Sequence, residues 1–391
     1  MHKALKNSLA LLVIILSLFS YGISIPKDEI KSNTPKADIE DLDINTSGEI
    51  KETYLVVKVL KVLADIEEDL PGGNKQRVQH LLLKVLSGND KGKERISVNV
   101  VPDNPAFAIV GNVGKKYLVT KIESVDDGKE DYFIVDYYRQ SFVFFLIGLF
   151  FIVVIVVARF KGIRTIISLI ITIAFIAFLL IPSIERGVNP LLSAVIISIL
   201  ATGITMLLVA GKNLKSLAAT LGTGVGVAIS GLIATFVINM APLSGLANTE
   251  AMILWGNQLF NLNFKGLLAA GMIVSCLGAV MDVAISIASS IQEIKIANPS
   301  YSGKQLFTSG MNVGNDIIGT MTNTLVLAYT GMALPLLILI SNESNPIKFL
   351  NLELVVSEVT AAIAGSIGLI IAVPVTAIIM SLMVGSKHKN G

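Results

Sequence analysis

A single carboxylate inside a long apolar segment is the first candidate for chemistry in this chain. Asp282 lies in the run GAVMDVAISIASSIQEI, which extends from Gly278 to Ile294. An ionised side chain near the centre of a bilayer costs at least about 2.5 to 3.5 kcal/mol. A chain that keeps such a residue usually uses it, so Asp282 is a candidate for holding a proton or a cation.

Polar residues follow Asp282 and recur in the next apolar segment. Offsets of +4, +7, +8 and +11 from Asp282 fall on one face of an α-helix, and they carry Ser286, Ser289, Ser290 and Glu293. The next segment has the same spacing from Asp316, with Thr322 beside the row Thr320, Asn323 and Thr324.

Two readings of these stripes remain open. Serine, threonine and asparagine can hold membrane helices together, at about 0.6 to 2 kcal/mol per hydrogen bond. Alternatively, the two stripes face each other and form a cytoplasm-facing site for a proton or small cation. In that hypothesis Asp282, Ser286 and Asn323 bind the ion, and Asp316 lies at the inner mouth.

The composition indicates an integral membrane protein. Of 391 residues, 53% are hydrophobic and 15% are charged, which is too apolar for a soluble chain of this length. A helix needs about 20 apolar residues to cross the hydrocarbon core. The sequence predicts eight spans: Leu5 to Ile25, Ser141 to Ala158, Thr165 to Ile184, Pro190 to Ala210, Ser216 to Met240, Gly266 to Ile291, Asp316 to Ile340 and Val355 to Val384.

The basic residues predict the orientation of these spans. With a cytoplasmic N-terminus, the short outside loops hold only Arg186, Lys265 and Lys348, while the inside segments hold Lys3, Lys6, Arg159, Lys161, Arg164, Lys212, Lys215, Lys295, Lys304, Lys387 and Lys389. This excess follows the positive-inside rule. We therefore expect a multi-pass protein of the bacterial cell membrane with both termini cytoplasmic and residues 26–140 extracytoplasmic. The first span can also be read as a cleaved signal peptide, although no small-x-small cleavage site precedes Pro26 and a retained anchor is favoured.

Residues 26–140 differ in composition from the rest of the chain. They contain 17 Lys or Arg and 21 Asp or Glu, as expected of an aqueous segment. Residues 26–49 lack periodicity and read as a flexible linker, whereas residues 50–140 contain five runs typical of strands: Thr53 to Leu63, Arg77 to Leu86, Ile96 to Val101, Lys116 to Ile122 and Tyr132 to Tyr138. Five short strands predict a small all-β domain, OB-like in kind. Its acidic balance argues against binding nucleic acid.

Several common sites lack their parts in this sequence. Cys276 is the only cysteine, and the three histidines are scattered, so we expect no metal site, no cofactor and no Ser-His-Asp centre. No Walker A motif is present. The glycines Gly222, Gly224, Gly226 and Gly231 lie inside a predicted span, where they indicate close helix packing rather than a nucleotide loop.

Two connecting segments are ambiguous. Residues 295–314 (KIANPSYSGKQLFTSGMNVG) are too polar to span, and they read as a cytoplasmic loop or, alternatively, as a gate or re-entrant segment. Residues 248–263 (NTEAMILWGNQLFNLN) are too short to cross, and Trp255 in them is typical of an interface anchor.

The quoted motifs, together with SGMNVGNDIIGTMTNTLVLAYTG, Asn298-Pro299, Tyr138-Arg139 and Lys161-Gly162, resemble the YibE/F-like family of bacterial multi-span membrane proteins. The resemblance covers about residues 50–340. It implies an N-terminal span, an extracytoplasmic β domain and a seven-helix membrane part, but no established activity. One departure is Asn315, where the family pattern commonly has a basic residue before the aspartate that corresponds to Asp316.

We therefore predict a polytopic α-helical membrane protein of about eight spans with a small extracytoplasmic β domain. Its predicted parts are an anchor or signal segment (1–25), a linker (26–49), a β domain (50–140), a seven-helix membrane domain (141–385) and a cytoplasmic tail (386–391). The favoured function is a secondary permease for a small solute or ion, with Asp282, Ser286, Ser289, Asp316, Thr320, Asn323 and Thr324 as its site residues. The alternative is an envelope assembly or lipid-handling factor that binds an envelope protein through its outer domain. An enzyme is not expected, because no nucleophile and base pair is apparent.

Overall fold

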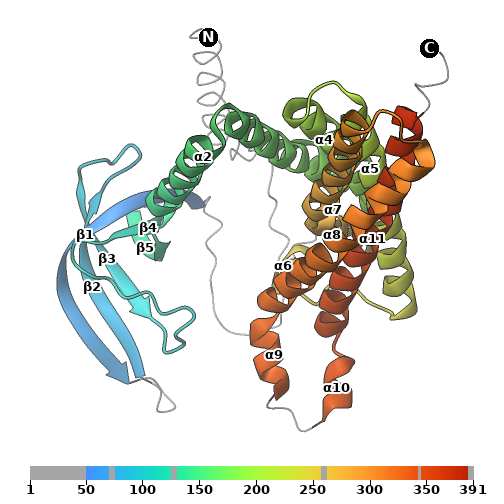
Figure 1. The fold of residues 1–391 in the computed structure, drawn as a ribbon. Helices are drawn as coiled ribbons and strands as arrows, with labels where there is room; N and C mark the ends of the chain where they lie inside the picture. The colour runs from blue at the N-terminus through green and yellow to red at the C-terminus, as the bar shows by residue number, and fades with distance from the viewer. Residues whose placement is uncertain (1–49, 70–74, 125–129, 257–261, 342–344, 386–391) are drawn as a thin grey trace. The chain divides into compact units, whose positions relative to one another are not determined.

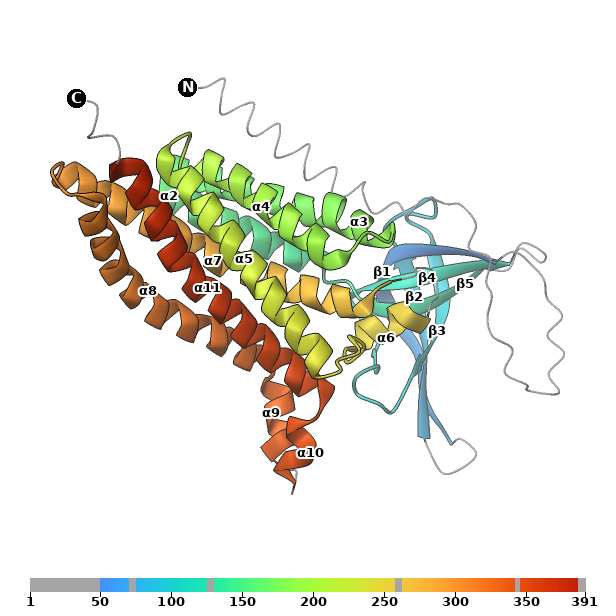
Figure 2. The same ribbon diagram turned by 90° about the vertical axis from the view of Figure 1, so that its right-hand side faces the viewer.

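The computed structural model describes residues 50–69, 75–124, 130–256, 262–341 and 345–385 (Figures 1 and 2). The chain divides into two compact units, residues 1–152 and 153–391. The predicted first span and the linker, residues 1–49, lie outside the described residues, as does the C-terminal tail.

The first unit contains a five-stranded antiparallel sheet. Its strands are β1 (Ile50–Asp69), β2 (Lys75–Val85), β3 (Glu94–Val101), β4 (Lys116–Ser124) and β5 (Glu130–Tyr137), in the order β3-β2-β1-β4-β5. The five predicted strands are confirmed, with β1 longer at both ends than its apolar run indicated. β1 pairs with β4 through its first part, from Ile50 to Lys58, and with β2 from Val57 to Asp69.

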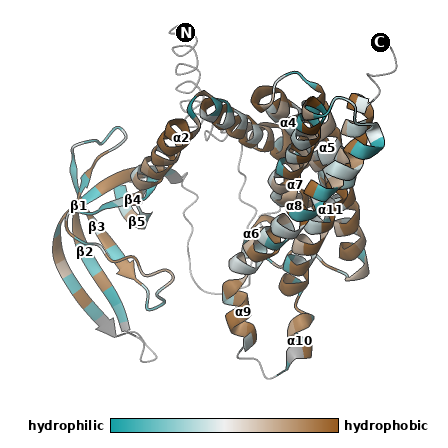
Figure 3. Cartoon of the chain, viewed as in Figure 1, coloured by the Kyte–Doolittle hydropathy of each residue, from teal (hydrophilic) through white to brown (hydrophobic). Residues whose placement is uncertain are grey.

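Apolar and polar residues alternate along the strands, so one face of the sheet is apolar and lines the inside of its curve. Bands of hydrophobic and hydrophilic residues alternate along β1 and β2 (Figure 3), as expected when successive side chains point to opposite faces. The inward residues form a single core, consisting of Leu55, Val57, Val59, Leu81, Leu83, Val85, Tyr117, Val119 and Tyr132. The Tyr117 hydroxyl, inside this core, donates to the Val110 carbonyl at 2.8 Å and accepts from the backbone N–H of Asn112 at 2.8 Å.

Side chains join the two edge strands, β3 and β5. The Ser97 hydroxyl donates to the Tyr132 carbonyl at 2.5 Å, and Arg95 donates to the Tyr132 hydroxyl at 3.2 Å. Arg95 also pairs with Glu130 at 3.1 Å. Because these bonds connect the outermost strands, the sheet curls into a half-barrel whose open side is bridged by side chains.

An ion network ties the loop after β2 to β4 and β5. Lys121 lies 3.0 Å from Asp90 and 2.7 Å from Glu130, and Lys93 lies 2.7 Å from Asp90. The hydrogen bonds from Lys93 and Lys121 lower the pKa of the Asp90 carboxyl to about 2. The bond to Glu130 raises the pKa of the Lys121 ammonium in turn. Lys121 likewise lowers the pKa of the Glu130 carboxyl, so Asp90, Glu130 and Lys121 are all charged at neutral pH.

The helices that follow the sheet are long and apolar (Figure 3). They are α2 (Gln140–Phe175), η1 (Ile176–Leu180), α3 (Ile181–Glu185), α4 (Pro190–Val209), α5 (Leu214–Met240), α6 (Thr249–Gly256), α7 (Phe264–Ala297), α8 (Gly303–Met332), α9 (Leu334–Ser341), α10 (Pro346–Leu350) and α11 (Glu353–Gly385). Among the described residues, five helices are long and apolar enough to cross a membrane, or six if α8 and α9, bent by 68°, count as one span.

The predicted count of eight spans is not confirmed. One predicted span lies in residues 1–49, outside the described range, and the second and third fall in one continuous helical stretch, Gln140–Glu185. Within this stretch the backbone of Arg159 leaves the helical region, at φ 50° and ψ −130°. This kink falls between the two predicted spans, Ser141 to Ala158 and Thr165 to Ile184.

Glycines bring the central helices into close contact. Gly226 of α5 lies against Gly368 of α11. A Cβ added at Gly226 would lie only 2.6 Å from the Gly368 carbonyl oxygen, and a Cβ added at Gly368 would lie 2.6 Å from the Gly226 carbonyl oxygen. Gly222 packs on Thr376, Gly224 on Ile199 and Gly231 on Ile273. The prediction that these α5 glycines serve helix packing is therefore confirmed.

The prediction of a 20-residue connector at residues 295–314 is wrong. α7 continues to Ala297 and α8 begins at Gly303, so only five residues separate the helices. Ser302 starts α8 with a capping box. The backbone N–H of Gln305 donates to the Ser302 hydroxyl at 3.4 Å, and the backbone N–H of Ser302 donates to the side-chain oxygen of Gln305 at 2.9 Å. The polar residues that suggested a loop are one face of an amphipathic helix.

Candidate functional site

The helix α7 has one buried face and one exposed face, and Asp282 lies on the exposed one. Val283, Ala284, Ile287 and Ile291 are fully buried in the core of the second unit. Asp282, Ser286 and Glu293 are exposed, and Ser289 and Ser290 are partly exposed. The predicted polar stripe on α7 therefore exists, and it faces away from the core.

The stripe continues toward the start of α7 through small residues. Gly271, Ser275 and Gly278 precede Asp282 at offsets that keep to the same face, and all three are exposed. A Cβ added at Gly271 or Gly278 would meet no atom within 4 Å. From Gly271 to Glu293 this face is about 33 Å long at 1.5 Å per residue, and all seven of its stripe positions are glycine, serine or acidic. We call it the α7 stripe: Gly271, Ser275, Gly278, Asp282, Ser286, Ser289 and Glu293.

The predicted residues on α8 are also exposed. Asp316, Thr320, Asn323 and Thr324 lie on the outer side of α8, while Leu306, Gly310, Gly314 and Leu325 are buried against the bundle. Asn312, Asn315 and Gly319 share the exposed side. α8 is thus amphipathic, with its polar side outward.

The two helices pack through their apolar sides. Gly310 of α8 meets Ile291 of α7, and Gly314 meets Ile287, which defines an antiparallel pair. Continued along both helices, this register places Asp282 at about the level of Gly319. A Cβ at Gly319 would meet nothing within 4 Å, so α8 presents no side chain at that level.

Three hydroxyl groups on the two stripes donate to their own helices. Ser286 donates to the Asp282 carbonyl at 2.7 Å, and Thr324 donates to the Thr320 carbonyl at 2.9 Å. Thr320 donates to the Ile317 carbonyl at 3.1 Å. Among the described residues, no hydrogen bond joins one stripe to the other. The carboxylates of Asp282 and Asp316 also lack a partner in that part of the chain, so these two side chains do not hold the helices together.

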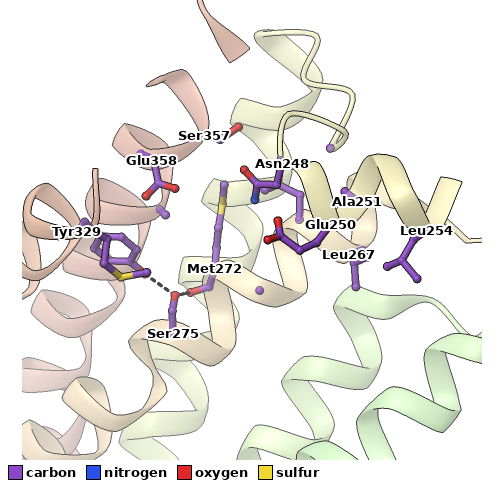
Figure 4. Close-up of a pocket in the computed structure, with 15 residues that line it drawn as sticks. Asn248, Glu250, Ala251, Leu254, Leu267, Met272, Ser275, Tyr329, Ser357 and Glu358 are labelled. Atoms are coloured by element: carbon purple, nitrogen blue, oxygen red, sulfur yellow. Dashed lines mark hydrogen bonds between the residues drawn. The ribbon is translucent and has the colours of Figure 1, made fainter. Parts of the chain in front are cut away.

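A cavity that the sequence did not suggest lies at the Gly271 end of the α7 stripe (Figure 4). Its volume is about 340 Å³, and α6, α7, α8 and α11 line it. The polar groups in its wall are Asn248, Glu250, Ser275, Tyr329, Ser357 and Glu358. The hydroxyls of Ser275 and Tyr329 hydrogen-bond to each other. Gly271 and Ser275 belong both to the cavity and to the α7 stripe.

The rim of this cavity is fixed by the first residue of α11. The Glu353 carboxylate accepts hydrogen bonds from the amides of Ser244 and Gly245, at 2.7 Å and 2.8 Å, and from the Ser244 hydroxyl at 2.9 Å. Gly245 has a φ of 80°, in the left-handed region that favours glycine. A Cβ at this position would lie 2.4 Å from the Phe264 carbonyl, so the loop and the start of α7 are in close contact.

Glu358 is the residue of this cavity that the sequence itself could have pointed to. It is an acidic residue inside the apolar run of the last predicted span, as Asp282 is in the sixth. Its helix, α11, carries the predicted span Val355 to Val384. Within the described residues, no group of three or more His, Cys, Asp or Glu side chains could hold a metal ion.

The family model described as YibE/F-like protein matches residues 146–386, which is more than half of the chain. The chain belongs to the YibE/F-like family. The match starts within α2 and ends in the tail, so it includes the α7 stripe and the cavity but not the half-barrel. No curated protein and no solved structure matches the chain.

Proposed function

We propose that this YibE/F-like protein is a secondary permease that moves a small solute or ion along the polar faces of α7 and α8. One observation carries the proposal. The α7 stripe contains no large apolar side chain over about 33 Å, a distance close to the thickness of the hydrocarbon core of a bilayer. An unbroken small and polar row of this length is unusual on a helix that is otherwise apolar.

The cost of such a face in lipid supports the proposal. Serine, aspartate and asparagine side chains are unfavourable against acyl chains, and polar side chains in membrane proteins usually line a water-filled cavity or the interior of a bundle. Water and solute along the α7 stripe would satisfy these groups. Asp282 lies at the middle of the row, where a titrating or cation-binding carboxylate can couple movement to a gradient.

The surroundings follow from the charge distribution. In this proposal the protein lies in the bacterial cell membrane with cytoplasmic termini and with the half-barrel outside. The five strands and the partly open barrel agree with an OB-like domain. The cavity is then near the outer end of the α7 stripe, and Glu293 is near the cytoplasmic end.

The test uses the full-length protein reconstituted in liposomes that contain a pH-sensitive dye. Proton, sodium and potassium gradients are imposed one at a time. Wild-type protein should give a change in internal pH under at least one gradient, Asp282→Asn should abolish it, and Glu185→Gln, a change of an exposed acid on α3 outside the stripe, should not. If Asp282→Asn keeps the full response and Asp282→Leu only lowers thermal stability, Asp282 is structural and the proposal fails.

The alternative function, an assembly or lipid-handling factor, has its own supporting observation. β3 is an edge strand, and it exposes Ile96, Val98 and Val100. A row of exposed apolar side chains is a surface that a protein partner can cover. In this second proposal an envelope protein binds there. Ile96→Lys together with Val98→Lys should then remove a cross-linked partner from whole cells without changing the level of the protein.

A further inference from the structure

The cavity at the outer end of the α7 stripe brings two carboxylates into one wall without a basic residue. Figure 4 shows the Glu250 and Glu358 side chains directed into the cavity from opposite sides, Glu250 from α6 and Glu358 from α11. Neither carboxylate forms a hydrogen bond or an ion pair with a described residue, and the described residues that line the cavity include no Lys, Arg or His. The site is therefore short of positive charge.

A buried hydroxyl adds a second unsatisfied group. Ser357 lines the same cavity, its side chain is only 7% exposed, and its Oγ has no hydrogen-bond partner among the described residues. This oxygen is itself shielded from solvent, so Ser357 is a buried polar group beside the cavity wall. The wall of the cavity thus contains two unpaired carboxylates, with an unpaired hydroxyl buried beside them.

The rest of the wall is apolar and of a size suited to a small molecule. Leu254, Leu267, Leu268, Met272, Met332 and Ala361 supply most of it. A volume of about 340 Å³ lies in the range of small-molecule sites. Tyr329 contributes an aromatic ring, whose face attracts cations.

We propose that this cavity binds a small organic cation, an ammonium group on an apolar body. The ammonium lies between Glu250 and Glu358, and the apolar part contacts the leucine and methionine side chains. An inorganic divalent cation fits less well, because calcium takes six to eight oxygen ligands. Here the Ser275 and Tyr329 hydroxyls are already bonded to each other. This site does not depend on transport: binding is expected whether or not the permease proposal holds.

The test measures ligand-induced thermal stabilisation of the purified full-length protein. The probes are choline, its neutral isostere dimethylbutanol, and calcium chloride. Choline should raise the melting temperature in a saturable way, whereas dimethylbutanol and calcium should not. Glu358→Gln should weaken choline binding at least about tenfold, because it removes an opposing charge from a partly buried position. Glu250→Gln should weaken it by less, because Glu250 is exposed to solvent. Glu185→Gln should leave it unchanged.

A second variant separates loss of binding from loss of folding. Gly271 lines the cavity, and a Cβ there would meet open space, so Gly271→Leu should fold normally and fill the cavity while keeping both acids. It should abolish the response to choline, while the melting temperature without ligand should be unchanged or higher. Equal stabilisation by dimethylbutanol would show a merely apolar pocket, and stabilisation by calcium that needs Glu358 would show an inorganic site. Either result, or a choline response that survives both the glutamine variants and Gly271→Leu, would overturn the proposal.

Discussion

The contact between Gly226 and Gly368 gives the most direct test of how the membrane helices are held together. An alanine at Gly226 would place its Cβ 2.6 Å from the Gly368 carbonyl oxygen, and 3.0 Å from both Ala372 and Val280. Ordinary contact begins at 3.4 Å. The blocking atom belongs to the backbone of α11, which cannot rotate away, so α5 and α11 must separate.

The size of the effect follows from two opposing terms. Overpacking of this kind costs about 3 kcal/mol at the upper end of its range, whereas alanine in place of glycine gains about 1 kcal/mol of helix propensity. The net destabilisation by Gly226→Ala is therefore about 2 kcal/mol. For a unit of this size it should lower the melting temperature by about 4 to 8 °C.

Cys276 supplies the readout for this experiment. It is the only cysteine and is fully buried in the core of the second unit, so a maleimide dye that fluoresces on reaction reports the opening of the bundle. Gly278→Ala is the matched control, because its Cβ would meet open space on the same bundle; it should leave the melting temperature unchanged or raise it. The double variant Gly226→Ala, Gly368→Ala should cost less than the sum of the two, since both changes separate the same pair of helices. Equal melting temperatures for Gly226→Ala and Gly278→Ala would refute the reasoning.

Further predictions concern both units. Residues 50–138, expressed alone, should give a β-rich circular dichroism spectrum and lose stability between about pH 4 and pH 2. The reason is that the Asp90 pKa is about 2 in the folded domain but 3.8 in the unfolded chain. The stabilisation by Asp90 is therefore complete above the unfolded pKa and is lost as the pH falls through the folded pKa. Lys121→Met should lower the free energy of unfolding of that domain by about 1 to 3 kcal/mol in urea titration, since it leaves two carboxylates without their shared donor. Glu353→Gln should lower the melting temperature of the full-length protein in the dye assay, by weakening charge-assisted hydrogen bonds worth about 1 to 2 kcal/mol. Cysteines introduced in place of Ser344 and Ser386, both outside the described residues, should react with an impermeant reagent from the outside and the inside of cells respectively.

Each of these predictions has a result that would contradict it. A disordered spectrum for residues 50–138 at neutral pH would show that the half-barrel needs the rest of the chain. An unchanged urea midpoint for Lys121→Met would mean that solvent satisfies the two acids as well as the lysine does. An unaltered melting temperature for Glu353→Gln would assign no stabilising role to its charge. Reversed labelling at both cysteines would show that the orientation in the membrane is opposite to the predicted one.

The sequence predicted the elements whose pattern is local. Alternation of apolar and polar residues located all five strands, since one face of each strand fills the core of the half-barrel. The glycines of α5 were assigned correctly because a membrane span offers them no role except packing. The polar stripe from Asp282 was visible at helical spacing, and its residues do share one exposed face.

Two features differ from the prediction or were absent from it: the start of α8, where local signals conflict, and the cavity, which depends on contacts between residues far apart in the sequence. Three glycines, Gly303, Gly310 and Gly314, predict breaks at the start of α8, yet two of them pack against Ile291 and Ile287 inside a continuous helix. The capping pair Ser302 and Gln305 was the signal that would have corrected the reading. The cavity was not predictable in this way, because its wall combines four helices that lie far apart along the chain.

The arrangement of β1 also affects how the half-barrel can form during synthesis. Its second part pairs with β2, the next strand, but its first part must wait for β4, where Ile50 meets Ser124. Until then the start of β1 is an unpaired edge in the growing chain, and such an edge can capture strands of other molecules. Glu52 and Lys58 are exposed on this part of the strand, and charges at an edge oppose such capture. The order of the strands along the chain therefore leaves the sheet incomplete until β4 emerges, and the charges on β1 protect it in that interval.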